Sequence, residues 1–598
     1  MANENEIAPE GLAKAEAEAA PEEAPVSQPE AEPGESAEEA PQPEPDPPAM
    51  TEAESEAGCP IWMGRSGGQK CGRKFHAAPE GVDNQPVCLM HSKDPNKQSG
   101  PLFDAFWLEF ERILQEAGKN VANFSQFFIP FADFRKRRFD AICLFDGATF
   151  TQSADFSFAI FTQDADFSGA TFAQNAYFGR VTFFQNAYFN ELNFVQDATF
   201  FNAAFTQNAY FRRATFTQDA NFSGTTFTQD AFFYSATFIQ GADFSEAAFT
   251  QNVGFYRATF TQNAHFDGAI FTQNAYFNGA IYAQNAHFDR ATFMQIAEFT
   301  LTEFYGTVDL RECRFLDQAN FRHTKFLPKE SKMPSAVFSL AKFAKPGEIV
   351  FEDVDLSRAL FLNCDVSAVW FTSSVTWARR TGYRGLAVFE EEILLDPKLA
   401  KKLEKYGSID HGAVEQIYYQ LQKNYDTRLD YRKANDFHYG EMEMRRLEPT
   451  AGGLFSLVPR FLRRWASLLN LYRIASDYGN SYAKPGAWLL ATLLAAMFLF
   501  PVTGLELKQP KSGNAAGNAI VTYQSVWNRQ DSWTNNLWTE GKLVIKSGIT
   551  AIDTATFQRN PEYTPVYPSG RILGIIETLL TSSLFALFLL AIRRQFRR

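Results

Sequence analysis

The chain has 598 residues, a formal net charge of −13 and 61 Phe, far above the usual share of that residue. Its length exceeds one ordinary domain, so several modules are expected. The 6 Cys are scattered unevenly, which argues against the disulfide framework of a small secreted protein.

Most of the negative charge lies in residues 1–58. This segment has 17 acidic residues, ten Pro and a single Lys, Lys14, so it nets −16 and the rest of the chain about +3. The segment has too few apolar residues for their burial to offset the conformational entropy that folding would cost. We therefore expect a disordered acidic tail. It lacks the basic and apolar regions of an export signal, so we expect no export of the N-terminal half.

The next segment, 59–95, carries a metal-ligand pattern, Cys59-x11-Cys71-x16-Cys88-x2-His91. Three thiolates and an imidazole suit a closed tetrahedral zinc site, with the last two ligands on one tight turn. The segment resembles small Cys3His zinc fingers of plant and viral proteins. We predict a structural zinc ion, because four protein ligands leave no open position for catalysis. His76 is a rival fourth ligand, and three reduced cytosolic thiols are the alternative.

Residues 100–127 are expected to cap the module that follows. Their apolar side chains from Phe103 to Leu114 have helical spacing. A bare strand edge at the end of a repeat array would invite aggregation, and a terminal helix covers it.

An aromatic repeat dominates the middle of the chain. From Phe145 an aromatic residue recurs at alternating steps of five and six, and Ala usually stands two residues before it. A helix would scatter these positions around its surface. A strand places residues i−2 and i on the same side. The pattern therefore predicts a mainly β solenoid with Ala and Phe inside.

Segments such as Ala165-Asp166-Phe167-Ser168-Gly169 resemble pentapeptide repeats. The resemblance covers 128–371 and implies a right-handed quadrilateral β-helix with four repeats per coil. It also implies that the central residue and the residue two before it face inward. The extra residue in every second unit lengthens the coil from 20 to 22 residues.

Gln recurs every 11 positions, from Gln152 to Gln295, and Asn or Asp usually follows it. A four-sided coil would align these Gln in two columns on opposite sides, where stacked amides can hydrogen-bond. We interpret them as structural corner residues, with partner binding as the alternative. His265 and His287 are 22 residues apart and are expected to stack on one outward face.

After the repeats the apolar spacing becomes helical. Residues 385–450 contain Asn424-Tyr425 and Ala434-Asn435-Asp436-Phe437 on either side of a turn region, 428–430. They resemble one tetratricopeptide-like helix pair. One pair is too short for a superhelix, so packing against the solenoid is the favoured interpretation and partner docking the alternative.

The end of the chain is membrane-like. Residues 485–505 and 572–592 are apolar and long enough to span about 30 Å of hydrocarbon. A third segment, 455–484, reads as an interfacial amphipathic helix. Arg and Lys flank the spans on their outer chain sides. The positive-inside rule then predicts cytoplasmic termini, a cytoplasmic solenoid and an extracytoplasmic loop at 506–571 in a bacterial inner membrane.

Glu577 lies inside the second span, near Thr578 and Thr581. A carboxylate at such a depth is a functional-site candidate. Helix packing by the neighbouring hydroxyl side chains is the favoured interpretation.

These features favour a non-enzymatic interaction scaffold, anchored in the membrane, for an unknown protein partner; the spans could also pair two copies. An alternative is an ion-channel-like protein whose two spans a solenoid regulates. A second is a DNA mimic that binds gyrase-like enzymes, although residues 150–304 net only −8 and nucleic-acid binding is disfavoured. No phosphate loop, nucleophile elbow or two-His metal helix occurs in the sequence.

Overall fold

The computed structural model describes residues 58–63, 68–328, 330, 332–380, 385–448, 467–507, 520–522, 533–556 and 563–595. The chain divides into two units, Met1–Glu56 and Ala57–Arg598, and the described residues belong to the second. The expected acidic tail lies outside them except for Gly58. So does the first part of the expected interfacial helix, 455–466.

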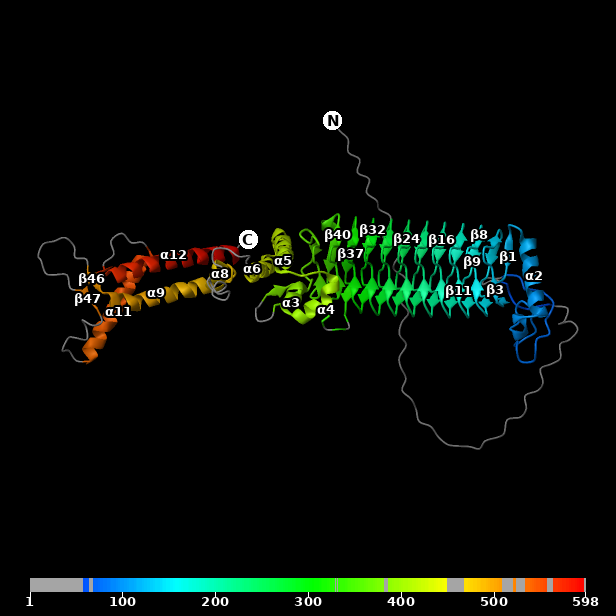
Figure 1. Cartoon of the computed structure of the whole chain (residues 1–598), viewed down its shortest axis with the longest axis horizontal. Helices are drawn as coiled ribbons and strands as arrows, with labels where there is room; N and C mark the ends of the chain where they lie inside the picture. Colours follow the sequence, from blue (N-terminus) through cyan, green and yellow to red (C-terminus); the bar gives the residue numbers. More distant parts are fainter. Residues whose placement is uncertain are drawn as a thin grey trace, which may run out of the picture. The chain divides into compact units, whose positions relative to one another are not determined.

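The repeats form a solenoid of short parallel strands with four faces and about 11 turns (Figure 1). Face 1 runs from β1 (Val121–Asn123) to β43 (Trp370–Phe371), and face 2 from β2 (Phe128–Ile129) to β38 (Lys325–Phe326). Face 3 runs from β3 (Ala132–Asp133) to β42 (Ala359–Leu360), and face 4 from β4 (Arg138–Phe139) to β40 (Lys342–Phe343). Faces 1 and 3 are opposite, because the chain visits the faces in numerical order.

Strand register confirms the predicted coil of 22 residues. Ala154 of β7 (Ala154–Asp155) pairs with Ala176 of β11 (Ala176–Tyr177), which pairs with Ala198 of β15 (Ala198–Thr199). The predicted four-sided β-solenoid, with helices in the C-terminal region, is therefore confirmed.

Two kinds of corner alternate along the chain. The tight corner after every second Phe holds one residue in the left-handed region, and this position recurs every 11 residues. Gly occupies it at Gly224 (φ +65°), where a Cβ would collide with the Asn202 side chain of the previous coil. The looser corner contains the extra residue of the six-residue unit, at the Gln positions.

Phe rings fill the inside of the solenoid in stacked columns. Phe156, Phe178 and Phe200 stack with centroids 4.8 Å apart and planes within 2°. Neighbouring columns meet edge to face, as Phe178 and Phe189 do at 5.7 Å and 88°. Both arrangements suit the quadrupole of an aromatic ring. The Ala residues two positions earlier are also fully buried, because residues i−2 and i of a strand point to the same side. The parallel register stacks these Ala residues on one another from coil to coil.

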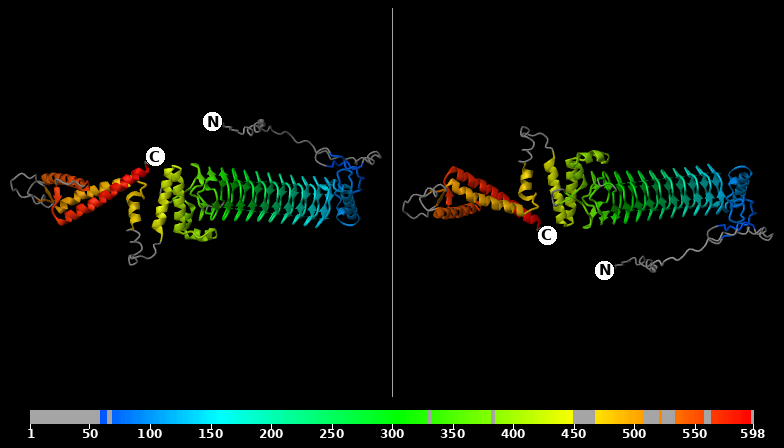
Figure 2. Two further views of the ribbon diagram at one scale, coloured as in Figure 1. Left: turned by 90° about the horizontal axis from the view of Figure 1, so that it is seen from above. Right: turned by 90° about the horizontal axis from the view of Figure 1, so that it is seen from below.

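Helix α2 (Pro101–Ala117) covers the first coil (Figure 2). Phe106 and Phe110 of this helix are fully buried, and Phe110 stacks on Phe124 at 4.1 Å. Arg137 of the solenoid pairs with Glu111 of the helix at 2.5 Å. The open strand edges at this end are thus covered by an apolar helix face.

The helical hairpin of α5 (His411–Thr427) and α6 (Tyr431–Leu447) covers the last coil (Figure 2). Asn424 donates from Nδ2 to the carbonyls of Val366 and Val369, both at 2.8 Å. The indole of Trp377 donates to the Tyr425 hydroxyl at 2.8 Å. The hairpin therefore provides hydrogen-bond donors for backbone carbonyls of the last coil, which has no further coil to pair with.

Shorter elements complete this end of the solenoid. Helices α3 (Phe389–Leu395) and α4 (Pro397–Leu403) pack on Val337 and Leu360, which point outward from face 3. Strands β44 (Ala378–Arg379) and β45 (Leu386–Ala387) form a small antiparallel pair.

Helices α9 (Ala483–Thr503) and α12 (Pro568–Gln595) are long and apolar enough to cross a membrane. Their bounds differ from the predicted spans. Gly504 (φ +78°) ends α9 two residues early, because its left-handed backbone interrupts the helix. Helix α12 extends beyond the predicted span at both ends. Pro568 suits the first turn of a helix, and the Arg and Gln residues at the other end are good helix formers.

The predicted loop at 506–571 contains a helix, α11 (Trp533–Ala555), which packs against both α9 and α12. Two hydrogen bonds fix it: Ser547 donates to the Met497 carbonyl, and Thr578 donates to the Thr554 carbonyl at 3.2 Å. Strands β46 (Leu505–Leu507), β47 (Ile520–Val521) and β48 (Tyr563–Pro565) form an antiparallel sheet beside it. Helix α8 (Leu468–Ser476) precedes α9.

Candidate functional site

The four predicted metal ligands come from a pair of extended segments and from one short turn. Cys59 and Cys71 lie on neighbouring extended segments, where the Cys71 amide donates to the Ile61 carbonyl and the Gly72 amide to the Cys59 carbonyl. Gly58 (φ +65°) allows their close approach, because a Cβ there would collide with Gly72. Cys88 and His91 lie on one turn, in which the His91 amide donates to the Cys88 carbonyl.

The ligand atoms of Cys59, Cys71, Cys88 and His91 lie within 4.8 Å of one another. His91 Nδ1 is 3.4 Å from Cys59 Sγ and 3.2 Å from Cys88 Sγ, and Cys71 Sγ is 3.7 Å from Cys88 Sγ. A tetrahedron with zinc-like bond lengths has S–S edges of about 3.8 Å and S–N edges of about 3.5 Å. The cluster can therefore hold a metal ion at its centre.

The surroundings of the cluster orient its ligands. His91 Nε2 lies 3.2 Å from the Ser125 carbonyl, which favours a proton on Nε2 and a free Nδ1. Arg73 donates to Cys71 Sγ at 3.2 Å and to Glu109 at 2.8 Å. Hydrogen bonds from the neighbouring thiols hold the pKa of Cys71 well below its usual range. Such outer contacts raise metal affinity by fixing ligand geometry and charge.

His76, the rival ligand, is not part of the cluster. Its Nε2 lies 2.8 Å from a carboxylate oxygen of Asp94. Cys59, Cys88 and His91 are at most 4% exposed and Cys71 is half-buried, so all four positions around the centre are taken by protein groups. A closed four-ligand centre is a structural site rather than a catalytic one.

Lys97 joins the cluster's segment to the solenoid, and sequence reasoning did not find it. Its buried ammonium donates to the carbonyls of Leu89, Ser92 and Phe128 at 3.0, 2.5 and 2.7 Å. Burial lowers the pKa of Lys97 to about 7. A single Lys in a polar stretch carries no sequence signal for such burial.

The repeat Gln side chains do not form the hydrogen-bonded column that stacked amides could have made: none has a side-chain hydrogen bond among the described residues. At several corners the Asn or Asp after the Gln instead accepts a hydrogen bond from a backbone amide of the next coil. Asp164 accepts from the Asn186 amide at 2.9 Å, and Asp230 accepts from the Asn252 amide at 3.0 Å. The corner is therefore stabilised by the shorter side chain, and the Gln side chains remain available at the surface.

His265 and His287 stack on face 3 with ring centroids 4.7 Å apart, as their spacing predicted. Asp267 lies 3.3 Å from the His265 ring and raises the pKa of that imidazole. Burial lowers the pKa of His287. The pair is thus held with at most one positive charge near neutral pH.

An aromatic surface, which sequence reasoning also missed, lies on face 1. Tyr188, Tyr210 and Phe232 point outward from successive strands and stack at 4.9 and 5.0 Å. Gly254 follows in the same column, where the Tyr234 ring fills the place that a Cβ would take.

Tyr256 and Tyr276 continue this surface, with centroids 5.3 Å apart. The guanidinium of Arg212 lies over the rings of Tyr210, Phe232 and Tyr234 at 5.6, 5.0 and 5.3 Å. We call these residues the aromatic surface; they are Tyr188, Tyr210, Arg212, Phe232, Tyr234, Tyr256 and Tyr276. The sequence did contain a signal for the aromatic surface, since an aromatic residue directly before a buried Phe recurs at intervals of 22 residues.

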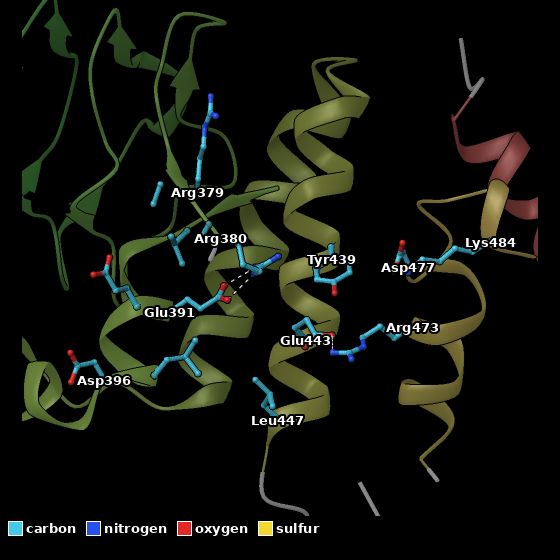
Figure 3. A pocket seen from close by; sticks show the side chains of 15 residues that line it. Arg379, Arg380, Glu391, Asp396, Tyr439, Glu443, Leu447, Arg473, Asp477 and Lys484 are labelled. Carbon is cyan, nitrogen blue, oxygen red and sulfur yellow. Dashed lines mark hydrogen bonds and ion pairs between the residues drawn. The ribbon is translucent and has the colours of Figure 1, made fainter. Parts of the chain in front are cut away.

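A cavity of about 620 Å³ lies between the end of the solenoid, α6 and α8 (Figure 3). Its charged side chains come from all three elements. They form the ion pairs Arg380–Glu391 (2.7 Å), Arg473–Glu443 (3.6 Å) and Lys484–Asp477 (2.6 Å). The cavity therefore reads as a charged junction between the solenoid and the segment that leads into α9.

The comparisons with known proteins agree with the geometry of the solenoid. A family described as pentapeptide repeats (9 copies) matches residues 145–193, 200–247, 211–259, 233–281, 255–301 and 288–328. No curated protein and no solved structure matches the chain.

Proposed function

Because the chain belongs to the pentapeptide-repeat family, we propose that it is a non-enzymatic interaction scaffold anchored in a membrane. The aromatic surface is the observation that carries this proposal. It is a contiguous set of half-exposed rings with Arg212, held by a rigid core. Tyr and Arg are enriched among the residues that supply most binding energy at protein interfaces.

The basic residues around the aromatic surface indicate the partner's chemistry. Arg212 and Arg257 are exposed there, and Arg213, also exposed, lies 3.7 Å from Glu191. They favour a protein partner whose docking surface has aromatic or apolar side chains beside carboxylates. The rings cost little conformational entropy on binding, because their neighbours in the stack already fix them.

Contacts at α6 support the anchor. Asn435 of α6 accepts hydrogen bonds from Asn480 at 2.9 Å and from Arg594 at 2.7 Å. Tyr478 donates to Glu443 of the same helix at 2.8 Å. The residues that flank both membrane-spanning candidates therefore bond to the helix that covers the solenoid end.

Photocrosslinking in intact membranes tests the scaffold. A photoreactive amino acid replaces Tyr210 on the aromatic surface, and in a matched control it replaces Asn221 on the opposite face. We expect one dominant crosslinked protein from position 210 only. Arg212→Glu should reduce its yield at least tenfold, which corresponds to about 1.4 kcal/mol. Equal yields from both faces, or none from position 210, would contradict the proposal.

We also propose that Cys59, Cys71, Cys88 and His91 bind zinc and that this ion fixes the segment before α2. Three thiolates with one imidazole in a closed tetrahedral set favour zinc over harder cations. Elemental analysis of the purified full chain should find one zinc per chain, and Cys71→Ser should lose it. Cys143→Ser, a buried core thiol outside the cluster, should retain it. A zinc-free wild-type protein would refute this proposal.

A further inference from the structure

Glu577 is a buried residue of α12, the helix that packs against both α9 and α11. It is on the buried side of α12, between Gly574 and Thr581, and is 2% exposed. Helix α11 packs closely on this side, since a Cβ on Gly574 would lie 3.5 Å from the Thr554 methyl group. Helix α11 also bonds to α9 through Ser547 and the Met497 carbonyl.

Neither carboxylate oxygen of Glu577 has a hydrogen-bond partner in the described part of the chain. The hydroxyl protons of nearby residues are already used. Thr581 donates to the Glu577 carbonyl at 2.8 Å, Thr578 to the Gly574 carbonyl at 2.8 Å, and Thr554 to the Thr550 carbonyl at 2.6 Å. A hydroxyl whose proton is donated elsewhere can only accept. These three threonine hydroxyls can therefore offer lone pairs but no proton to Glu577, and the buried hydroxyl of Ser582, farther along α12, makes no hydrogen bond within the described residues.

No basic side chain in the described residues forms an ion pair with Glu577. Helix α9 has one charged residue, Lys484, and this is about 20 Å along the helix from Met497. The other charged residues of α8, α11, β46 and α12 are Arg473, Glu506, Glu540, Lys542, Lys546, Asp553, Arg571, Arg593 and Arg594. A bare carboxylate without solvent or partner is strongly disfavoured, so its charge must be neutralised from outside the chain.

We propose that Glu577 binds a single positive charge, either a proton or a sodium ion, at the junction of α9, α11 and α12. The site deepens the proposed function, because it rests on α9 and α12 lying in a membrane. Carboxylate, hydroxyl and backbone oxygens are the groups that take up protons and sodium ions within membrane proteins. Occupation would join the three helices, so the cation would control how tightly α11 packs on the two spans.

The test measures the thermal unfolding midpoint of the purified full chain in lipid nanodiscs between pH 6 and pH 9. One series contains sodium chloride and the other choline chloride at the same ionic strength. In choline we expect the wild-type midpoint to fall by several degrees as pH rises. Recovery of the midpoint with sodium identifies a sodium site, and no recovery identifies a proton site. Glu577→Gln should abolish any sodium dependence and reduce the pH dependence to the part that the buried Glu390 contributes in the same range, whereas Glu540→Gln should keep both at the wild-type size.

Equal pH and sodium dependence in the wild type and Glu577→Gln would overturn the proposal. If Glu577→Gln does not fold, a wild-type midpoint that is constant across pH and salt overturns it instead. The anchor is tested separately by alkaline extraction of membranes. Release of the chain into the supernatant would refute the anchor, while the unfolding midpoints would still report on the charge at Glu577.

Discussion

Single buried residues at the solenoid's C-terminal end supply the hydrogen-bond partners of backbone groups in its last coil. Glu390 of α3 is fully buried, and one carboxylate oxygen accepts from the Phe361 amide at 2.5 Å. Its other oxygen has no hydrogen-bond partner among the described residues. Burial raises the pKa of Glu390 from 4.5 to about 7. The folded state therefore binds this proton more tightly than the unfolded chain does.

Stability from Glu390 should accordingly be complete below pH about 4.5 and be lost as the pH rises through about 7. At pH 8 we expect Glu390→Gln to slow hydrogen exchange in peptides that contain Phe361. The side-chain carbonyl of the introduced Gln can still accept from the Phe361 N–H, and it does so without a buried charge. At pH 4.5 the variant and the wild type should differ little. Glu392→Gln, an exposed neighbour on α3, is the control. Faster exchange in Glu390→Gln at pH 8 would contradict this assignment.

At the residue scale, sequence patterns predicted what repeats and missed what occurs once. The Phe positions, the His265–His287 stack and the clustering of Cys59, Cys71, Cys88 and His91 were predicted from their spacing. Lys97 and Glu390 do not, because their burial depends on carbonyls and amides that are 31 and 29 residues away in the chain. The Gln residues do stand at the corners, but the shorter Asn or Asp beside some of them, rather than the Gln amide, reaches a backbone amide of the next coil.

At the scale of elements, the caps matter most, because a solenoid has open strand edges only at its ends. Asn424 of α5 is 1% exposed and bonds to two carbonyls of the last coil. Asn424→Ala would leave the Val366 carbonyl unpaired, while Arg428 would still donate to the Val369 carbonyl at 2.9 Å, and should cost about 1–3 kcal/mol of stability.

We expect a lower thermal midpoint for Asn424→Ala and faster proteolysis near residue 366. Tyr419→Ala changes the same helix at a side chain that is 47% exposed, and it should leave both unchanged. An Asn424→Ala protein with the wild-type midpoint would show that the hairpin is not required to close the solenoid.

Sequence reasoning reached the capping elements and the two apolar helices, since amphipathic spacing and apolar length leave clear signals. It missed α11, whose Gly, Ser, Thr and charged residues resemble a polar loop. Its small residues are explained only by the close packing at Gly548 and Thr554 against α9 and α12. Helix packing of this kind depends on backbone approach, which hydropathy does not report.

At the scale of the whole molecule, we propose that the solenoid presents its aromatic surface on one side of a membrane and that α9 and α12, which are long and apolar enough to cross it, hold the solenoid there. The Arg and Lys residues beside both helices favour a cytoplasmic solenoid and an opposite location for residues 506–571.

Labelling of single introduced cysteines with a membrane-impermeant maleimide in intact cells tests this claim most directly. Asn221→Cys reports on the solenoid, and Thr556→Cys, at an exposed position after α11, reports on the segment between the spans. The wild-type chain, with its native cysteines, is the background. We predict labelling at position 556 in intact cells and at position 221 only after permeabilisation. Equal labelling of both positions before permeabilisation would contradict a membrane between them.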